Sequence, residues 1–405
     1  MTAVMEGVRI LEVAEHTFVP AASALLADWG AEVIKVEHVE RGDAMRGLLS
    51  SSGLSFMKSN VHVLLEHSNR GKQSIGLDLT TPEGLEILYK LAGTCDVFLT
   101  NKLPSVRTKL KVDVDDIRAH NPNIIYVRGT GQGERGPDAD RGSYDALAYW
   151  NRSGVAMGLK PADEEFVPAP PPAFGDSIGA MTIAGGIMGA LFHREKTGEA
   201  TTVDVSLLSV GMWSMGAGLA LSLQLGIPWG GGRSGAGGTN PLSGNYLLKD
   251  GKQVAFTCLQ PMRYWPDACK LIDRPELATD ERFKDFESMA ANAAEAIEIM
   301  REAFASKTAE EWRPRLEAFS GQWTFVQTTL EVVEDQQTIA NGLVSDCTDV
   351  NGESFQLVTA PVQFGGVPAQ PKRAPEFNEQ GDAILESLGL DMDAIVDLKV
   401  KGVVA

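Results

Sequence analysis

An aspartate at the start of a small-residue helix is the residue of this chain best suited to covalent chemistry. Asp176 lies in Gly175–Asp176–Ser177, after a proline-rich segment (168–172) and before a run dense in glycine and alanine. A carboxylate can act as a covalent nucleophile when the acyl group that it attacks is already activated, as in a thioester. A helix N-terminus favours the ionised form of such a side chain. Aspartate is also a common helix N-cap, so a purely structural role stays open from the local sequence alone.

Basic and polar residues recur at positions that follow predicted strands. Each alone is typical of a solvated surface charge, but loops after parallel strands are where α/β folds bind ligands. A phosphorylated cofactor fits such a set. Its members are His38, Arg41, Arg46, Arg70, Lys72, Asn101, Lys102, Arg107 and Lys109.

A glycine-rich segment, 229–238 (WGGGRSGAGG), is the third feature that could take part in chemistry. Such a composition is most often a flexible linker. It can also form a mobile lid, whose backbone N–H groups contact an acyl oxygen of the substrate.

Several common catalytic motifs are absent from the sequence. There is no nucleotide P-loop, no GxSxG and no HExxH. One GxGxxG occurs at Gly131, Gly133 and Gly136, but Pro137 follows it where a helix should begin, so we interpret it as a turn. The six histidines are scattered. Nothing specific therefore indicates a dinucleotide site, a Ser–His–Asp triad or a metal site, and we expect no tightly bound cofactor.

Strand and helix patterns alternate over the first 130 residues. Apolar runs predict strands, and a helix over 82–92 is bounded by a Thr81 N-cap and by Gly93. This alternation predicts βαβ units and a mainly parallel sheet, hence an α/β fold. With 405 residues, the chain is long enough for two domains. The predicted strands are 8–13, 33–36, 77–79, 97–99 and 124–127, and another early helix is 21–29.

Charge and composition narrow the partners that we expect. A net charge of −18 disfavours nucleic acid and anionic membranes. Four cysteines without metal spacing, and a start without the pattern of a signal peptide, are typical of a cytoplasmic protein. The uncharged stretch 205–227 is long enough to span a bilayer. Its serines, and the lack of flanking basic clusters, favour a buried or interface helix instead.

Segments spread over nearly the whole chain resemble the family III CoA-transferases, which include formyl-CoA:oxalate CoA-transferase, carnitine CoA-transferase and α-methylacyl-CoA racemase. Their order along the chain is the order of the family. The segments are LLADWGAEVIKVEHVERGDAMRG, NRGKQSIGLDLTTPEG, DVFLTN, AHNPNIIYVRGTGQGERGP, YDALA, GDSIGAMTIAGGIMGAL, TGEATTVDVSLL and PVQFGGVPAQPKRAP.

The resemblance implies a set of site residues. The catalytic aspartate of the family matches Asp176. Independently of the resemblance, we expect Gly235, Ala236, Gly237 and Gly238 of the glycine-rich segment to form a loop that closes over Asp176. This sequence departs from the common pattern at His38, at Asn101–Lys102 and, relative to the oxalate enzyme, at Thr17. The positions that correspond to CoA contacts are Thr17, His38, Lys72, Asn101, Lys102, Lys109 and Tyr144.

The resemblance also implies an architecture. It predicts an interlocked homodimer, in which each chain has a Rossmann-like large domain with a mainly parallel sheet and a smaller inserted α+β domain. We expect the first part of the large domain over 1–200, a linker helix over 201–228 and the small domain over 229–325. A return linker and the last part of the large domain then occupy 326–405.

The function that the resemblance implies is transfer of CoA from an acyl-CoA to a carboxylic acid, through an aspartyl-CoA thioester on Asp176. An acyl-CoA racemase or epimerase on the same fold is an alternative. Racemisation needs an acid and a base on opposite faces of the α-carbon. The racemases of the family carry a histidine where this chain has Tyr144, before Asp145, which favours transfer. A CoA-binding protein without catalysis is a second alternative, and the intact Asp176 argues against it.

Overall fold

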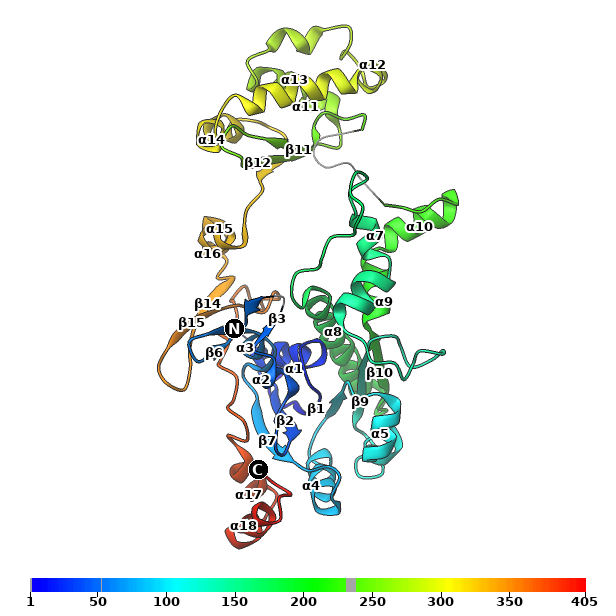
Figure 1. Ribbon diagram of the computed structural model, residues 1–405, viewed down its shortest axis with the longest axis vertical. Coiled ribbons are helices and arrows are strands. Elements are labelled where there is room, and N and C mark those ends of the chain that lie inside the picture. The colour runs from blue at the N-terminus through cyan, green and yellow to red at the C-terminus, as the bar shows by residue number, and fades with distance from the viewer. Residues whose placement is uncertain (1, 52, 231–237) are drawn as a thin grey trace. The chain divides into compact units, whose positions relative to one another are not determined.

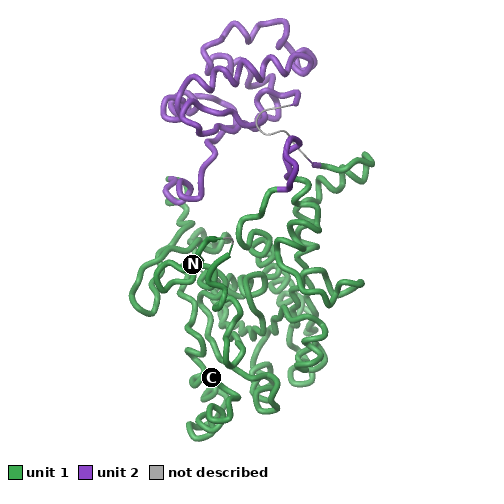
Figure 2. The backbone as a smooth tube through the Cα atoms, in the orientation of Figure 1, with its two compact units in different colours: residues 1–158, 168–229, 336–405 green, residues 159–167, 230–335 purple. Residues whose placement is uncertain are grey.

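The computed structural model describes residues 2–51, 53–230 and 238–405 (Figure 1). The chain forms two compact units (Figure 2). Unit 1 comprises residues 1–158, 168–229 and 336–405, and unit 2 comprises residues 159–167 and 230–335. The large unit is therefore built from both ends of the chain, and Asp176 belongs to it.

A parallel sheet of six strands is the centre of unit 1. Its order is β10-β9-β8-β1-β2-β7, and every pairing is parallel. The order changes direction between β1 and β8, and the crevice at the carboxyl ends of two such strands is where α/β sheets bind ligands. The strands are β1 (Arg9–Val13), β2 (Glu32–His38), β7 (Gln73–Leu77), β8 (Val97–Thr100), β9 (Ile125–Thr130) and β10 (Thr202–Ser206). The α/β class and the parallel sheet are thus confirmed.

Alternate residues of the strands face two different layers. Leu11 and Val13 of β1 belong to a core with α4 (Pro82–Ala92), α17 (Gly381–Ser387) and α18 (Met392–Val400). Glu12 points to the opposite face, because successive side chains of a strand alternate. On that face α1 (Phe18–Asp28) packs against α3 (Val63–Asn69) and α8 (Phe174–Thr197). The helix predicted over 82–92 is confirmed, with Thr81 accepting a hydrogen bond from the Gly84 N–H.

The uncharged stretch 205–227 is not a single buried helix. Its first residues end β10, and the rest forms α9 (Leu207–Ser214) and α10 (Gly216–Leu225), bent by 70°. By length and composition alone, α8 and the bent pair are each apolar enough to cross a membrane. The side chains of Trp213 and Leu223 are each 86% exposed on this chain. Of the two alternatives, the buried helix is therefore wrong for the chain by itself, and the interface helix stays a prediction.

Unit 2 is an α+β domain with its own core. A hairpin turns at Asp250–Gly251, and β11 and β12 pair antiparallel on either side of it. Its core contains Trp265, Trp312 and Phe304. The elements are β11 (Ser243–Leu247), β12 (Gln253–Thr257), β13 (Trp323–Phe325), α11 (Pro261–Leu271), η2 (Pro275–Thr279), α12 (Phe286–Ala291), α13 (Ala293–Ala305), α14 (Ala309–Glu317) and α15 (Thr329–Glu334).

Short elements complete unit 1. In the loops they are α2 (Ala44–Gly47), β3 (Ser50–Ser51), β4 (Leu54–Ser55), β5 (Met57–Lys58), β6 (Val61–His62), α5 (Pro104–Leu110), α6 (Val114–Arg118), the π-helix η1 (Ala146–Arg152) and α7 (Val155–Leu159). Toward the C-terminus they are α16 (Gln336–Ala340), β14 (Val344–Thr348) and β15 (Ser354–Val358).

Candidate active site

Asp176 lies in the first turn of α8. The backbone just before it is constrained at two positions, Ala173 and Gly175. Ala173, just before the helix, has a left-handed backbone with φ of 54°. A Cβ on Gly175 would lie 2.3 Å from Cγ of Tyr149, so only glycine fits against that ring. The start of α8 therefore packs closely against η1, and the side chain of Asp176 in its first turn is half-buried.

A second carboxylate, Asp145, caps this helix start from 30 residues earlier in the chain. Its Oδ2 accepts the N–H of Gly175 at 2.9 Å and that of Asp176 at 3.4 Å. Asp145 is only 7% exposed, and its Oδ1 is buried without a hydrogen-bond partner in the described part of the chain. The N–H groups that open α8 are therefore occupied by a carboxylate that the sequence analysis did not single out.

The two carboxylates influence each other's ionisation. Burial, and next the charge of Asp145, raise the pKa of Asp176 to about 7. Burial also raises the pKa of Asp145, against the lowering effect of the two N–H bonds. We expected the helix N-terminus to favour ionised Asp176, but these two effects prevail. A carboxylate of raised pKa is more basic when ionised and hence a stronger nucleophile for a thioester carbonyl.

Two histidines lie at this helix start or beside the segment that caps it, although the six histidines are scattered along the sequence. Nε2 of His67 is 3.4 Å from Oγ of Ser177, and the Ser177 hydroxyl donates to the Ala173 carbonyl. Burial, then the charge of Arg70, lower the pKa of His67 to about 4, which keeps its ring neutral. His16, the second, packs its ring against Tyr144. In residues 2–51, 53–230 and 238–405, no three His, Cys, Asp or Glu residues form a metal-binding group.

The crevice between β1 and β8 holds three of the positions matched to CoA contacts. Asn101 follows β8 and donates from Nδ2 to the Glu15 carbonyl at 2.7 Å, while its Oδ1 accepts the Glu15 N–H at 3.2 Å. Nζ of Lys102 pairs with Oε2 of Glu15 at 2.5 Å. Thr17 is 2% exposed, at the N-cap of α1. The loops after the two central strands are thereby tied together.

Two adjoining cavities open beside this crevice. The smaller, of about 170 Å³, is lined by His38, Arg41 and Lys102 among others. The larger, of about 740 Å³, is lined by Lys109. Both are also lined by Leu79, Thr80 and Leu110, so they are neighbours. Four of the basic side chains that the sequence analysis selected therefore line one continuous region at the carboxyl edge of the sheet.

Lys72 lies elsewhere, inside the protein. Its Nζ contacts Oε2 of Glu12 at 2.8 Å, the Pro20 carbonyl at 2.8 Å and Oδ1 of Asn69 at 3.1 Å, which engages all three of its protons. Burial lowers the pKa of Lys72, and Glu12 opposes that shift. Arg70 is likewise 2% exposed and pairs with Asp28. The expectation of solvated surface charges is wrong for these two residues, and also for Arg107, which is 2% exposed.

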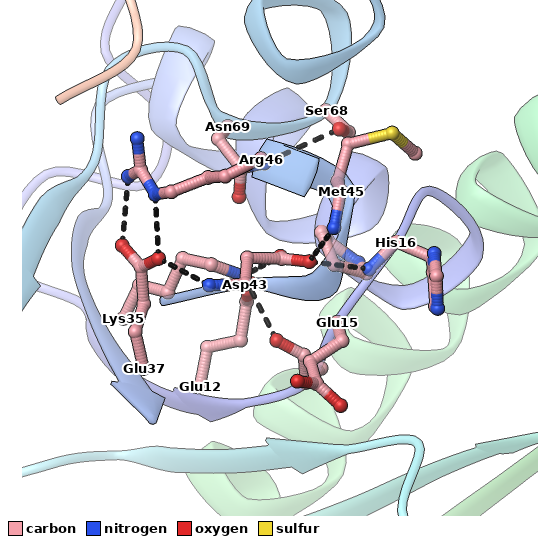
Figure 3. Close-up of polar contacts among 12 residues, drawn as sticks. Glu12, Glu15, His16, Lys35, Glu37, Asp43, Met45, Arg46, Ser68 and Asn69 are labelled. Atoms are coloured by element: carbon pink, nitrogen blue, oxygen red, sulfur yellow. Dashed lines mark hydrogen bonds and ion pairs between the residues drawn. The ribbon is translucent and has the colours of Figure 1, made fainter. Parts of the chain in front are cut away.

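Lys72 belongs to a buried network of charges between the sheet and α1. Glu12 pairs with both Lys35 and Lys72, and Lys35 pairs with Asp43 at 2.7 Å. Asp43 in turn accepts the N–H of His16 and of Met45 (Figure 3). Through these contacts the network fixes the loop between β1 and α1, where Thr17 lies.

Arg46 pairs with Glu37, as Arg107 does with Glu134. Tyr144 and the predicted glycine loop are the last of the predicted residues. Tyr144 is 64% exposed and immediately precedes Asp145. Gly235, Ala236 and Gly237 lie outside the described residues, and Gly238 follows with φ of 81°.

Comparison with known proteins places this arrangement in a family. The model of CoA-transferase family III matches residues 5–381. The chain is 30% identical to (R)-2-hydroxy-4-methylpentanoate CoA-transferase of Clostridioides difficile over 404 residues, 99% of each chain. It is 28% identical to formyl-CoA:oxalate CoA-transferase of Streptomyces avermitilis, covering 100% of both. The crystal structure of Rv3272 from Mycobacterium tuberculosis superposes with a TM-score of 0.80 at 28% identity, over 95% of this chain and 99% of that one.

The family match spans most of the chain, and these relatives carry the name of CoA-transferases, enzymes whose substrates are CoA thioesters. This chain is a CoA-transferase of family III.

Proposed function

We propose that this enzyme transfers CoA from an acyl-CoA to a carboxylic acid through an aspartyl-CoA thioester on Asp176. The observation that carries the proposal is the half-buried carboxylate in the first turn of α8, whose pKa is raised to about 7. At that pKa a large fraction of Asp176 is ionised near neutral pH, yet the oxygen keeps the basicity of a good nucleophile.

The reaction runs in two symmetrical halves. Oδ of Asp176 attacks the thioester carbonyl, and the C–S bond breaks to give a mixed anhydride and CoA thiolate. The thiolate attacks the aspartyl carbonyl and releases the donor acid, leaving an aspartyl-CoA thioester. The acceptor carboxylate attacks that thioester in the same way, and the thiolate then attacks the acyl carbonyl of the second anhydride. The new acyl-CoA leaves, and Asp176 is regenerated.

The cavities at the carboxyl edge of the sheet support a site for the nucleotide part of CoA. Lysine and arginine side chains suit the phosphates of that part, and Lys102, Arg41 and Lys109 line the two cavities. Because the net charge of the chain is −18, the attraction for CoA has to be local. We infer that these side chains supply it.

Relatives with printed substrates act on different acids. Their names include 2-hydroxy-4-methylpentanoate, phenyllactate, glutarate and oxalate, at 27 to 30% identity to this chain. We therefore propose a carboxylic acid as the acceptor class and leave its choice to a panel of acids. All four cysteines are unpaired and buried, which supports a proposed cytoplasmic location.

Trapping the thioester tests the proposal. The enzyme is incubated with acyl-CoA donors, digested, and analysed by mass spectrometry for CoA attached to the peptide that contains Asp176. We expect the adduct in the parent protein and in Asp163→Asn, an exposed control, but not in Asp176→Asn. Transfer by Asp176→Asn within about tenfold of the parent rate contradicts the assignment, because loss of a covalent nucleophile costs several orders of magnitude. Exchange of the α-proton for deuterium without transfer identifies a racemase instead.

A further inference from the structure

The backbone of His16 is held in a conformation that few residues other than glycine adopt. Its φ is 69°, in the left-handed region. Such strain persists only where the surroundings enforce it, and it is concentrated at functional sites. Here Asp43 enforces it, because its Oδ1 accepts the His16 N–H at 2.9 Å while Oδ2 pairs with Lys35 at 2.7 Å. Asp43 and Lys35 are fully buried.

This turn lies beside the helix face that carries Asp176. His16 follows β1 at the crevice between β1 and β8, and Phe18 begins α1 two residues later. The Phe18 ring fills the space at Gly179, where a Cβ would lie 2.3 Å from its Cε2. Gly179 is three residues after Asp176, and residues three apart share one face of a helix. The segment 16–18 therefore runs alongside the face of α8 from which Asp176 projects.

The imidazole of His16 is directed toward the same region. It points away from the buried charges (Figure 3), and its ring meets the Tyr144 ring edge-on at 5.5 Å and 89°. Tyr144 precedes Asp145, whose carboxylate accepts the Gly175 N–H next to Asp176. Within the described chain, the ring nitrogens of His16 make no hydrogen bond to a protein group. A hydrogen-bonding ring is thus held against Tyr144, the residue before the carboxylate that caps the start of α8.

We propose that His16 selects acids that carry a hydroxyl on the carbon next to the carboxyl group. This inference rests on the proposed function, since it needs the acyl group to be attached at Asp176. The substituent on that carbon then lies within a few bonds of the aspartate, on the side bordered by His16 and Tyr144. A neutral hydroxyl suits an imidazole, which can both donate and accept. A second carboxylate suits the site less, because the carboxylate of Asp145 already lies at the start of α8.

The test compares pairs of acids that differ only in the hydroxyl, such as lactate and propanoate. The acceptor kcat/KM is measured for the parent, His16→Gly and His16→Asn, with a donor that the parent uses. Glycine and asparagine both tolerate the left-handed backbone, so the fold should survive. Ser59→Gly is the matched control, because Ser59 is an exposed residue with φ of 56°.

We expect the parent and Ser59→Gly to prefer the hydroxy acids and one of their enantiomers. In His16→Gly both preferences should fall by about tenfold, the worth of a hydrogen bond, while transfer to the unsubstituted acids continues. His16→Asn should retain part of the preference. An unchanged ratio in His16→Gly, or a parent without preference for the hydroxyl, overturns the role of His16. Absence of transfer to every acid tested instead overturns the proposed function, and this inference with it.

Discussion

At the scale of single residues, the pair of carboxylates at the start of α8 helps to explain why the pKa of Asp176 is raised. Asp145 binds the N–H of Gly175 and approaches that of Asp176, so its charge lies beside the proposed nucleophile. Its carboxylate thereby does two things: it orients the helix start, and it raises the pKa of Asp176 together with burial.

The pH dependence of the first half-reaction should report this pair. Because only ionised Asp176 attacks, the rate of aspartyl-CoA formation should rise through a midpoint near pH 7. Asp145→Asn removes the neighbouring charge and should move the midpoint to lower pH. Single-turnover rates measured across pH check this, with Asp140→Asn, an exposed carboxylate in the same loop, as the control. A midpoint that Asp145→Asn leaves in place shows that the charge of Asp145 does not act on Asp176.

The same shift has a consequence for stability. A carboxyl group whose pKa is raised by folding favours the folded state less as pH increases from its unfolded value, near 4, to about 7. Above pH 7, Asp176→Asn should therefore be more stable than the parent, on the order of 1 kcal/mol, after allowance for partial solvent exposure. Near pH 4 the two proteins should be similar. Thermal melts of both proteins near pH 4 and above pH 7 measure this effect. The same difference in melting temperature between variant and parent at both pH values would contradict the prediction.

At the scale of elements, close contacts between glycines and the side chains of neighbouring elements fix where Asp176 lies. Gly175 meets Tyr149, Gly179 meets Phe18, and Gly129 on β9 meets Val19. The small-residue pattern of α8 was visible in the sequence, but the partner of each glycine was not. In contrast, the start and end of α4 were predictable, because a threonine cap and a glycine act on their own helix.

Two glycines of α8 should respond in opposite ways to alanine. Gly175→Ala forces a Cβ against Tyr149 and should cost about 1–3 kcal/mol of the free energy of unfolding, together with activity. Gly185 has open space around its Cβ position, and in a helix interior alanine is better than glycine by about 0.5–1 kcal/mol. Denaturant unfolding of both variants measures the difference. Equal behaviour would show that the Tyr149 contact does not restrict residue 175.

Substitution of two lysines matched to CoA contacts should distinguish a structural role, at Lys72, from a role in CoA binding, at Lys102. Lys72→Met leaves Glu12 buried with fewer partners, and removing one member of a buried ion pair costs about 3–5 kcal/mol. Lys102→Met should leave stability nearly unchanged but raise the KM for acyl-CoA, since Lys102 lines the cavity beside the crevice. Unfolding curves and KM values for both variants form the test. A normal stability with a raised KM in Lys72→Met would assign Lys72 to CoA instead.

The candidate site was only partly predictable, for reasons of distance along the chain. Asp176 was predicted because glycine, aspartate and a helix start are adjacent in sequence. Asp145 approaches it from 31 residues away, and His67 approaches the neighbouring Ser177 from 110 residues away. No local pattern marks such partners. Lys72 could not be recognised as buried, because Glu12, which neutralises it, is 60 residues distant and lies on another strand.

At the scale of the whole molecule, unit 1 has many large apolar side chains that are exposed on the single chain. Several large side chains of α8, α9 and α10 and of the segment after them face solvent on this chain. They are Phe192, Met212, Trp213, Leu221, Leu223, Leu225, Ile227 and Trp229. Many large apolar side chains exposed on consecutive elements are typical of a protein interface. We propose that a second copy of the chain covers it, as the predicted interlocked homodimer requires.

Light scattering and mass photometry should find two copies of the 43.5 kDa chain at every concentration from micromolar to nanomolar. Interlocked chains separate only by unfolding, so dilution alone should not release monomers. Trp213→Asp places a charge in the surface and should give unfolded or aggregated chains, because a charge that is buried without a partner is costly. Val400→Asp, on a side chain of α18 that is 82% exposed, should leave the dimer intact. A folded and active monomer of the parent at nanomolar concentration would show that the apolar surface of α9 and α10 does not bind a second copy.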